Sequence, residues 1–342
     1  MKKILIAVGG TGGHLFPAQQ LAAQLQNDFQ ILFAGYQLQK NMFFAQETNA
    51  FMEIAAHPLK KGFFKASRLG MRQALAMLKH FEPDVVVGFG SYHTFPILLA
   101  AAMRRKKLVL FEANCMLGKV NRVFRFFANY VACQFPLTLK NAVLVEWLPW
   151  KKPEPIDPKA ARIRLGLDPG KKTLLIFGGS QGASFFNEII PKVVWEFKKT
   201  VQVIHLTGVG QTEAVRSMYE KFEIQACVKP FESEMAVAYS AADIAICRSG
   251  AGTIAELIRF AVPALLIPYP FAADEHQRKN GEMLAHVWKG ARQVLQNQAD
   301  VSMLCRELEE LEKEAEECKS RLRLKQMDRE RTSLAEVIRK MR

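Results

Sequence analysis

The chain has 342 residues, 49% of them hydrophobic, and a formal net charge of +14. A chain of this length suits two domains better than one, and its apolar residues suffice for two hydrophobic cores. No stretch approaches the roughly 20 uninterrupted apolar residues that a transmembrane helix needs, which argues against a membrane-spanning protein.

The positive charge is concentrated in the first part of the chain. Residues 1–150 hold 17 of the 47 Lys and Arg residues but only 7 of the 33 Asp and Glu residues. Such an excess predicts a negatively charged partner, either phosphate groups, an anionic membrane surface or nucleic acid. General solubility is the alternative explanation, but it does not account for the asymmetry.

The N-terminus, MKKILIAVGG, has the two lysines and the apolar run of a signal peptide. The run ends at glycines after five residues, which favours a buried first strand instead. The six cysteines are scattered without C-x-x-C spacing, and this pattern predicts reduced thiols in a cytosolic protein.

Short apolar runs alternate with helical stretches through residues 1–150 and indicate βαβ units. The predicted elements are a helix at 17–26 and strands at 3–8, 29–35, 83–90 and 107–114. Because the runs lack a period of two, the predicted sheet is parallel and buried on both faces. Residues 1–150 are therefore expected to form a doubly wound, Rossmann-like domain.

A proline-rich segment, LPWKKPEPIDP, predicts a linker between two domains. After this segment, short apolar runs again alternate with helical stretches. This alternation predicts a second doubly wound domain over residues 159–325. From about Val301 the sequence changes to mixed charge with leucines at helical spacing, as expected of one or two solvated helices. We predict an α/β fold with two Rossmann-like, parallel-sheet domains that face one another across a cleft.

Four turns rich in glycine and polar residues follow predicted strands. They are GGTGGH (9–14), GFGSYHTFP (88–96), GGSQGA (178–183) and RSGAGT (248–253). Ligands of open α/β sheets bind outside the carboxyl ends of the strands, so we expect two phosphate-bearing ligands, one for each domain. A dinucleotide site is disfavoured because Leu15 stands where the third glycine of G-x-G-x-x-G belongs, and the Walker lysine of an NTPase is missing.

Polar side chains in and after these turns suggest how the second domain binds its ligand. Ser180 and Gln181, together with helix N–H groups, form a candidate anion cradle without a metal, although Ser180 also suits a helix cap. Glu256 is placed to accept two ribose hydroxyls, the alternative being an ordinary exposed glutamate. Gln277 and Asn280, spaced i, i+3 on one helical face, are candidates to bond sugar hydroxyls.

Two further motifs, FEAN (111–114) and DEHQRKN (274–280), complete a set that occurs in a fixed order along the chain. In this order and spacing the motifs resemble those of the MurG family, in glycosyltransferase family 28. The resemblance implies the GT-B fold, with a last helix (326–342) that returns to the first domain. It also implies inverting transfer of N-acetylglucosamine from UDP-GlcNAc to the C4 hydroxyl of a lipid-linked muramyl-pentapeptide, with neither cofactor nor metal.

The resemblance also assigns site residues. The expected UDP-sugar-binding residues are Thr11, Gly12, Gly13, Asn114, Lys151, Ser180, Gln181, Glu232, Ala251, Gly252, Thr253, Ile254, Ala255, Glu256, Gln277 and Asn280. The residues expected at the acceptor pyrophosphate are Gly10, Gly90, Ser91 and Tyr92. His14 either acts as the general base for the acceptor hydroxyl or only bonds substrate or packs the turn, and Glu112 and His93 are weaker candidates for the base.

Three motifs depart from the family pattern, one of them GFGSYHTFP, which has serine and threonine where glycine and serine are more usual. FEAN stands where the family usually has HEQN, and EWLPWKK where it has GNPVR, so that Lys151 replaces the usual arginine. Lysine keeps the charge but lacks the bidentate fork of arginine. These changes concern the details of donor binding rather than the class of enzyme. The alternatives are a glycosyltransferase with another lipid acceptor, a UDP-sugar epimerase, and a UDP-sugar-binding protein without activity.

Segments 59–81 and 121–131 of the first domain mix basic and aromatic residues. Such a mixture fits an anionic lipid surface, and the residues singled out for it are Lys60, Lys61, Phe63, Phe64, Lys65 and Arg68. The alternatives are amphipathic helices with core-facing apolar sides, and single-stranded nucleic acid, which no RNA-binding motif supports. Together with the family resemblance, this predicts a peripheral enzyme of peptidoglycan synthesis on the cytoplasmic face of the bacterial inner membrane, with a part in cell shape and division.

Overall fold

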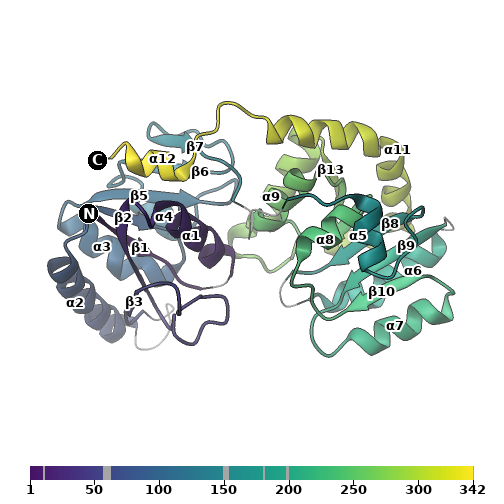
Figure 1. The fold of residues 1–342 in the computed structure, drawn as a ribbon, viewed down its shortest axis with the longest axis horizontal. Helices are drawn as coiled ribbons and strands as arrows, with labels where there is room; N and C mark the ends of the chain where they lie inside the picture. The colour runs from purple at the N-terminus through teal and green to yellow at the C-terminus, as the bar shows by residue number, and fades with distance from the viewer. Residues whose placement is uncertain (11, 57–62, 149–153, 180–181, 198–199, 342) are drawn as a thin grey trace. The chain divides into compact units, whose positions relative to one another are not determined.

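The computed structural model describes residues 1–10, 12–56, 63–148, 154–179, 182–197 and 200–341, with the side chains of 63–67 left out. The chain divides into two compact units, coloured along the sequence in Figure 1. Unit 1 comprises Met1–Lys151 and Arg329–Arg342, and unit 2 comprises Lys152–Asp328. Each unit is built on a parallel sheet of its own.

Unit 1 is a parallel sheet with helices on both faces. Its strands are β1 (Lys2–Ala7), β2 (Phe29–Gly35), β3 (Phe51–Glu53), β4 (Val85–Gly88), β5 (Lys107–Glu112), β6 (Tyr130–Cys133) and β7 (Ala142–Leu144). They lie in the order β3-β2-β1-β4-β5-β6-β7. Its helices are α1 (Gly12–Leu25), α2 (Phe63–Phe81), the short η1 (Tyr92–Thr94), α3 (Phe95–Met103), α4 (Lys119–Phe124) and α12 (Leu334–Arg339).

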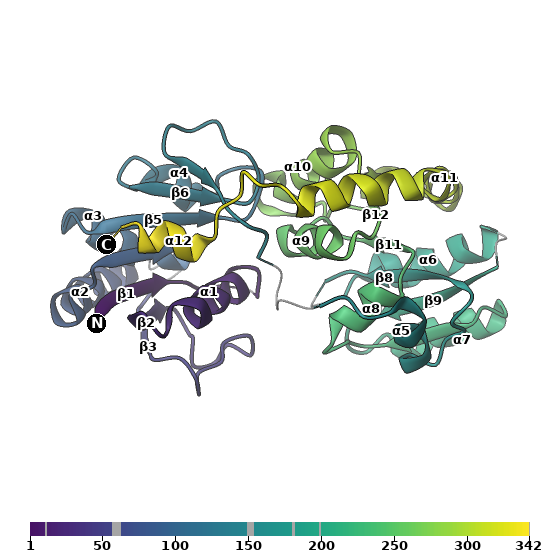
Figure 2. The same cartoon turned by 45° about the horizontal axis from the view of Figure 1, so that its top comes forward.

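The alternation of side chains along β1 buries both faces of this sheet. Ile4 and Ile6 pack into the cluster on one face, and Leu5 and Ala7 pack into the cluster on the other. Helices α1 and α12 cover the first face, whereas α2, α3 and α4 cover the second (Figure 2). The predicted parallel sheet, buried on both sides, is confirmed.

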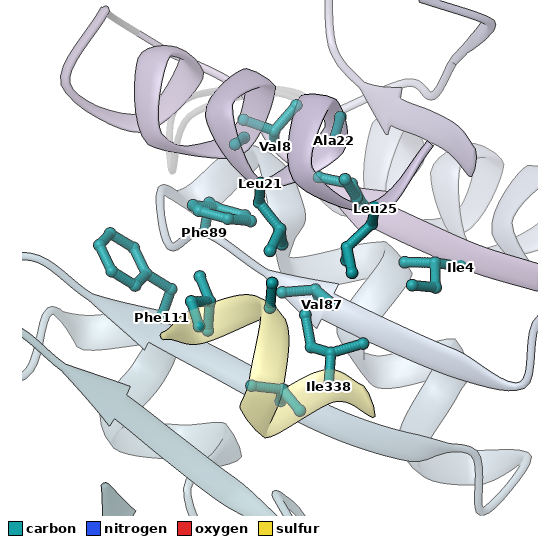
Figure 3. Packing of buried hydrophobic residues seen from close by; sticks show 14 of the residues in the cluster. Ile4, Val8, Leu21, Ala22, Leu25, Val87, Phe89, Phe111 and Ile338 are labelled. Carbon is teal, nitrogen blue, oxygen red and sulfur yellow. The ribbon is translucent and has the colours of Figure 1, made fainter. Parts of the chain in front are cut away.

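Helix α12 completes the core of unit 1 although it follows unit 2 in the sequence. In Figure 3, Ile338 from α12 lies on the same side of the sheet as Val87 and Leu25. The helix contributes these buried apolar side chains to the cluster: Leu334, Val337, Ile338 and Met341. A segment distant in sequence thus covers part of this face of the sheet beside α1.

Polar contacts made by Arg339 and Lys107 fix α12 at its far end. The Arg339 Nε donates to an Asp28 carboxylate oxygen at 2.8 Å. The Lys107 Nζ donates to the carbonyl oxygen of Met341 at 2.6 Å, at the C-terminal end of the helix, where a cation is favourable. Polar contacts therefore fix the position of the helix in addition to its apolar burial.

Unit 2 has the same architecture. Its strands are β8 (Lys172–Phe177), β9 (Val201–Leu206), β10 (Ala226–Lys229), β11 (Ile244–Cys247), β12 (Ala264–Leu266) and β13 (Ala291–Gln293), in the order β10-β9-β8-β11-β12-β13. Its helices are α5 (Pro158–Arg164), α6 (Ser184–Glu196), α7 (Thr212–Lys221), α8 (Met235–Ala241), α9 (Ala251–Phe260), η2 (Ala273–Glu275), α10 (His276–Glu282), η3 (Met283–Val287), η4 (Gln296–Gln298) and α11 (Val301–Gln326).

Helix α11 corrects the prediction of solvated helices after Val301. One side of the helix is buried in unit 2, through Leu304, Leu308, Leu311, Cys318 and Leu322. These positions fall three, four or seven residues apart and so form one apolar stripe. The high charge of the segment belongs to the other faces, where ion pairs such as Lys313–Glu310 lie. The leucines at helical spacing form this buried side, whereas the prediction of solvated helices followed the charge of the segment.

A buried polar network joins β9 to α6 and α7. His205 has no exposed surface, and its Nε2 lies 3.1 Å from Asn187 Oδ1 while its Nδ1 lies 3.0 Å from the Tyr219 hydroxyl. The amide of Asn187 is oriented by its Nδ2, which donates to the Thr207 carbonyl at 3.1 Å. Burial lowers the pKa of His205 to about 3, so the ring is neutral near pH 7.

Acidification should weaken unit 2 through His205. An unfolded histidine titrates near pH 6.5, so below that pH the unfolded chain binds a proton that the folded unit excludes. The stabilising contribution is complete above about pH 6.5 and is lost as the pH falls toward 3; at pH 4.5 the loss is roughly 2–3 kcal/mol. Amide hydrogen exchange of β9, which reports the opening of this unit, should show that loss in the wild type and not in His205→Gln.

The matched control is His286→Gln, which changes an exposed histidine of the same unit. Its β9 amides should follow the wild-type pH dependence. A stability difference between wild type and His205→Gln that stays constant from pH 7 to pH 4.5 would contradict the prediction.

Candidate functional site

The four glycine-rich turns lie where each sheet changes its winding direction. In unit 1 the switch falls between the adjacent strands β1 and β4, and in unit 2 between β8 and β11. Ligands of open α/β sheets bind at the carboxyl ends of strands at such switch points. GGTGGH follows β1, GFGSYHTFP begins at the end of β4, GGSQGA follows β8 and RSGAGT follows β11. The predicted placement of all four turns at strand ends is confirmed.

The two turns of unit 1 meet at His14. The predicted helix at 17–26 begins earlier, at Gly12, so His14 lies in its first turn. The His14 Nδ1 is 2.7 Å from the carbonyl oxygen of Phe89. Since a carbonyl only accepts, Nδ1 carries the proton, and the lone pair of the neutral ring is on Nε2. A Cβ atom at Gly90, where φ is 76°, would lie 3.5 Å from the ring. The second turn thus holds and orients the imidazole.

Ser91 occupies a strained position in the turn after β4. Its φ of 68° and ψ of 144° belong to a region that favours glycine. Its Oγ is 3.1 Å from His93 Nδ1, and its carbonyl accepts a hydrogen bond from the Thr94 hydroxyl at 2.9 Å. His93 is 8% exposed and stacks on Tyr36. His93 therefore packs the turn, and the structure gives no support to it as a base.

Glu112 organises the FEAN loop and is 4% exposed. Its Oε1 accepts from the backbone N and the side-chain Nδ2 of Asn114, both at 3.1 Å. Its Oε2 accepts from the backbone N of Gly118 at 2.9 Å and from Asn121 Nδ2 at 3.0 Å. A buried carboxylate with four donors holds the loop, so Glu112 is also unsupported as a base. It fixes Asn114, a predicted donor contact, at the end of β5.

In unit 2, the GGSQGA turn leads into α6. Gly179 and Gly182 have φ values of 96° and 73°, which other residues rarely adopt. A Cβ atom at Gly182 would lie 2.3 Å from the carbonyl oxygen of Thr207, so this position requires glycine. The predicted anion cradle, Ser180 and Gln181, lies outside the described residues.

The RSGAGT turn leads into α9, and Gly250 has no side chain to cap the first N–H groups of that helix. Behind the turn, Arg248 is 7% exposed and donates to the carbonyl oxygens of Ile267 and Pro268 at 2.9 and 3.1 Å. Its guanidinium lies 4.6 Å from the ring centre of Phe186. Burial lowers its pKa to about 10, so it stays cationic near pH 7 and adds positive potential at the turn.

The RSGAGT turn is tied to α10. The Ser249 hydroxyl donates to the carbonyl oxygen of Gln277 at 2.7 Å, and Asn280 Nδ2 donates to the carbonyl of Ser249 at 3.3 Å. The side-chain oxygen of Gln277 accepts from the backbone N of Tyr269 at 2.9 Å. Glu256, half-buried on α9, accepts a hydrogen bond from a tyrosine hydroxyl. Unit 2 thus brings the predicted ribose and sugar contacts onto connected segments.

The side chain of Glu232 is held within the loop after β10. Its Oε2 pairs with Lys229 Nζ at 2.9 Å, and its Oε1 accepts from the backbone N of Glu234 at 2.9 Å. The carboxylate therefore shapes this loop, and the backbone of Glu232 is the part that suits the predicted contact with the UDP-sugar.

Three of the residues predicted to bind the UDP-sugar are buried. Ile254, Ala255 and Asn280 have no exposed surface, and the amide of Ile254 donates to the carbonyl of Gly250 at 3.0 Å. The prediction took RSGAGTIAE as a continuous string of contacts, whereas each helical residue turns about 100° from the last and these two side chains face the core. Asn280 is buried below the surface, where its side chain donates to the carbonyl oxygen of Ser249 and so fixes the RSGAGT turn.

Several predicted residues lie outside the described parts of the chain: Thr11, Lys60, Lys61, Lys151, Ser180 and Gln181. The side chains of Phe63, Phe64 and Lys65 do as well. Of the other predicted contacts, Gly13, Gly252 and Arg68 are exposed, and Tyr92 is 46% exposed.

Sequence reasoning missed two residues of the site. Ser249 lies inside a recognised turn, and a serine beside a glycine-rich turn was the available signal. Tyr239 lies in the apolar run AVAYSAAD, where nothing in the sequence distinguishes it from a core residue.

Comparison with known proteins identifies the family. Residues 4–133 match the glycosyltransferase family 28 N-terminal domain, and residues 173–339 match the glycosyltransferase family 28 C-terminal domain. A relative from Protochlamydia amoebophila is 38% identical over 327 residues, which cover 90% of this chain and 87% of that protein. The chain belongs to glycosyltransferase family 28. That relative is named UDP-N-acetylglucosamine--N-acetylmuramyl-(pentapeptide) pyrophosphoryl-undecaprenol N-acetylglucosamine transferase.

A second relative and two solved structures are also similar to this chain. A protein of the same name from Azoarcus sp. strain BH72 is 35% identical over 89% of this chain and 88% of its own length. The crystal structure of Acinetobacter baumannii MurG covers 99% of this chain and 100% of its own chain, with a TM-score of 0.82 and 26% identity. The glycosyltransferase VinC, in complex with dTDP, shares the fold at a TM-score of 0.72 and 15% identity. The predicted MurG family, GT-B fold class and glycosyltransferase activity are confirmed.

The described residues offer neither a candidate metal site nor a candidate membrane-spanning helix. In these residues, no group of three His, Cys, Asp or Glu side chains is arranged to hold a metal ion. Among the helices that they form, none has both the length and the apolar character to span a membrane.

Proposed function

We propose that this family 28 glycosyltransferase transfers N-acetylglucosamine from UDP-GlcNAc to the C4 hydroxyl of a lipid-linked muramyl-pentapeptide. The observation that carries the proposal is the pair of glycine-rich turns at the switch point of each sheet, in a chain 38% identical to a transferase with this name. Glycine-rich turns at such strand ends suit a diphosphate because their backbone N–H groups are able to donate to its oxygens. Unit 2 would bind that of the nucleotide, and unit 1 that of the lipid carrier.

Helices α6 and α9 carry the proposed contacts with the sugar donor, UDP-GlcNAc. The first turns of both helices direct positive dipole ends to the carboxyl edge of the sheet, and Arg248 adds a buried cation behind α9. These groups would stabilise the charge that develops on UDP as it leaves. Glu256 would accept the ribose hydroxyls, and Gln277 would bond the hydroxyls of the transferred sugar.

His14 is the proposed general base for the hydroxyl of the acceptor. With Nδ1–H donated to Phe89, Nε2 is the basic nitrogen of the neutral ring. In the proposed step the C4 oxygen of the muramyl sugar attacks C1 of N-acetylglucosamine as its proton passes to Nε2. The bond from C1 to the phosphate oxygen breaks, and its electron pair leaves with UDP. Attack opposite the leaving group inverts the anomeric centre.

The test is release of UDP from UDP-GlcNAc with and without the muramyl-pentapeptide pyrophosphoryl lipid, with UDP-glucose and UDP-galactose alongside. We expect release from UDP-GlcNAc that depends on the acceptor. Binding of UDP-GlcNAc with no release would instead indicate a UDP-sugar-binding protein. Release with a diacylglycerol acceptor and none with the muramyl lipid would assign a different acceptor and overturn the proposal.

We further propose that unit 1 docks on an anionic membrane surface, where the lipid-linked acceptor lies. The segment around the end of α4 exposes Phe126 by 76%, Phe127 by 59% and Val123 by 50%. The Arg125 guanidinium lies 4.7 Å from the ring centre of Phe126. Apolar side chains beside cations suit the headgroup region of a bilayer. This placement fits a peripheral enzyme of peptidoglycan synthesis on the cytoplasmic face of the inner membrane, with a part in cell shape and division.

Substituting Phe126→Ser should weaken binding to vesicles that contain anionic lipid by about tenfold, the effect of losing one inserted aromatic side chain. Cosedimentation with such vesicles measures it. Phe271→Ser is the control because it removes a phenylalanine, 81% exposed, from unit 2. Equal binding by wild type and Phe126→Ser would exclude this surface as the membrane contact.

A further inference from the structure

A buried tyrosine contacts the carboxylate proposed to bind ribose. Tyr239 on α8 is 1% exposed, and its hydroxyl donates to Oε2 of Glu256 on α9 at 2.8 Å. Glu256 is itself half-buried, so the bond lies at the boundary between the core and the surface of unit 2. A hydrogen bond to a charged acceptor in such surroundings is stronger than one in water.

The ring of Tyr239 is fixed independently of its hydroxyl. It stacks on Phe260 with ring centres 5.2 Å apart and planes 13° apart. It meets Phe177 edge to face, with ring centres 5.7 Å apart. Phe177 is the last residue of β8, directly before the GGSQGA turn, and Phe260 ends α9. The aromatic contacts thus hold the ring between the end of β8, which precedes the GGSQGA turn, and the C-terminal end of α9.

Packing alone does not explain a tyrosine at this position. Phenylalanine, of which the chain has 24, would fill the same space without burying a hydroxyl. A buried hydroxyl carries a desolvation cost unless it is bonded. Burial and the charge of Glu256 raise the pKa of Tyr239 well above its ordinary value, so the hydroxyl remains a donor at all physiological pH values.

We propose that Tyr239 is a positioning residue for recognition of the nucleotide ribose. By donating to Oε2, it fixes the rotamer of Glu256. A carboxylate has about four acceptor directions, so both oxygens keep acceptor capacity for the 2′ and 3′ hydroxyls. This inference rests on the proposed function, in which Glu256 binds the ribose. The hydroxyl of Tyr239 acts only through Glu256 and not on the ligand.

The experiment is Tyr239→Phe, which keeps the aromatic packing and removes the hydroxyl alone. Calorimetry would measure the affinity for UDP and for its 2′,3′-dideoxy analogue. We expect UDP to bind about tenfold more weakly, the effect of one hydrogen bond to a charged group, and the analogue to bind as it does to wild type. In steady-state assays KM for UDP-GlcNAc should rise and kcat should change little.

Tyr219→Phe is the matched control. Tyr219 is also 1% exposed in unit 2, but its hydroxyl bonds His205 rather than a residue of the site. It removes an equally buried hydroxyl and should leave UDP affinity unchanged. In a Glu256→Ala background, Tyr239→Phe should have no further effect on UDP affinity, because the two act as one unit.

The outcomes separate this inference from the proposed function. If wild type binds UDP and the dideoxy analogue equally well, the ribose role of Glu256 fails. If wild type prefers UDP and Tyr239→Phe keeps the same preference and affinity, the positioning role fails while the proposed function stands. Equal losses for UDP and the analogue would show a general disturbance of the site and would also overturn the positioning role.

Discussion

Replacing His14 by alanine should lower kcat by roughly 10²–10⁴-fold, the range expected for loss of a general base. Affinity for UDP-GlcNAc should change little, because the proposed contacts for its nucleotide lie in unit 2. The expectation follows from the bond between Nδ1 and the Phe89 carbonyl, which leaves Nε2 as the basic nitrogen. Turnover with the muramyl-pentapeptide lipid and calorimetry with UDP-GlcNAc measure the two quantities.

A second variant, His14→Asn, separates base chemistry from positioning. The side-chain amide of asparagine occupies nearly the place of Nδ1–H and is able to donate to Phe89, but it offers no basic nitrogen. If His14 is the base, both variants should lose the same large factor in kcat. Recovery of most of the activity in His14→Asn would show that the histidine serves only to hold the turn.

Deleting residues 329–342 should unfold unit 1. The deletion removes the buried side chains Leu334, Val337, Ile338 and Met341 and exposes the apolar surface beneath them. At about 1.5–3 kcal/mol for each, the loss is roughly 6–12 kcal/mol, as large as the stability of a typical domain. Amide hydrogen exchange should show the strands of unit 1 unprotected while those of unit 2 keep their protection.

Point substitutions in α12 provide the graded version of this test. Ile338→Ala, at a position with no exposed surface, should cost about 2–5 kcal/mol of unit 1 stability. Lys340→Ala, at an exposed position on the following turn, should stay within about 0.5 kcal/mol of wild type. Full protection of β1 and β4 after the deletion would show that α12 is dispensable for the core.

The fold was predictable because apolar runs and glycines carry local information. A run such as KILIAV followed by GGTGGH specifies a buried strand and a turn without any knowledge of the partner strands. Since all strands of a parallel sheet point one way, the turns after them share an edge. The positions of the candidate site at the strand ends could therefore be predicted before the strand order was known.

What could not be predicted depends on which face of an element is covered. Ile254 and Ala255 belong to a recognised motif, yet the direction of their side chains is set by how α9 packs on the sheet. The leucines of α11 are spaced as one stripe, but only the packing of the helix on unit 2 shows that this stripe is buried. Tyr239 shows the limit most clearly, since its partner Glu256 is distant in sequence and the pair forms only when α8 and α9 pack together.

Because α12 belongs to unit 1, the core of unit 1 is completed only after unit 2 has been synthesised. The ribosome synthesises β1 first. Residues 334–341, whose side chains complete the core of unit 1, are synthesised only after all of unit 2. Until then, the apolar face of unit 1 that α12 covers is exposed to solvent. Such a surface binds chaperones or aggregates. Unit 1 is therefore the first unit to begin folding and the last to be completed.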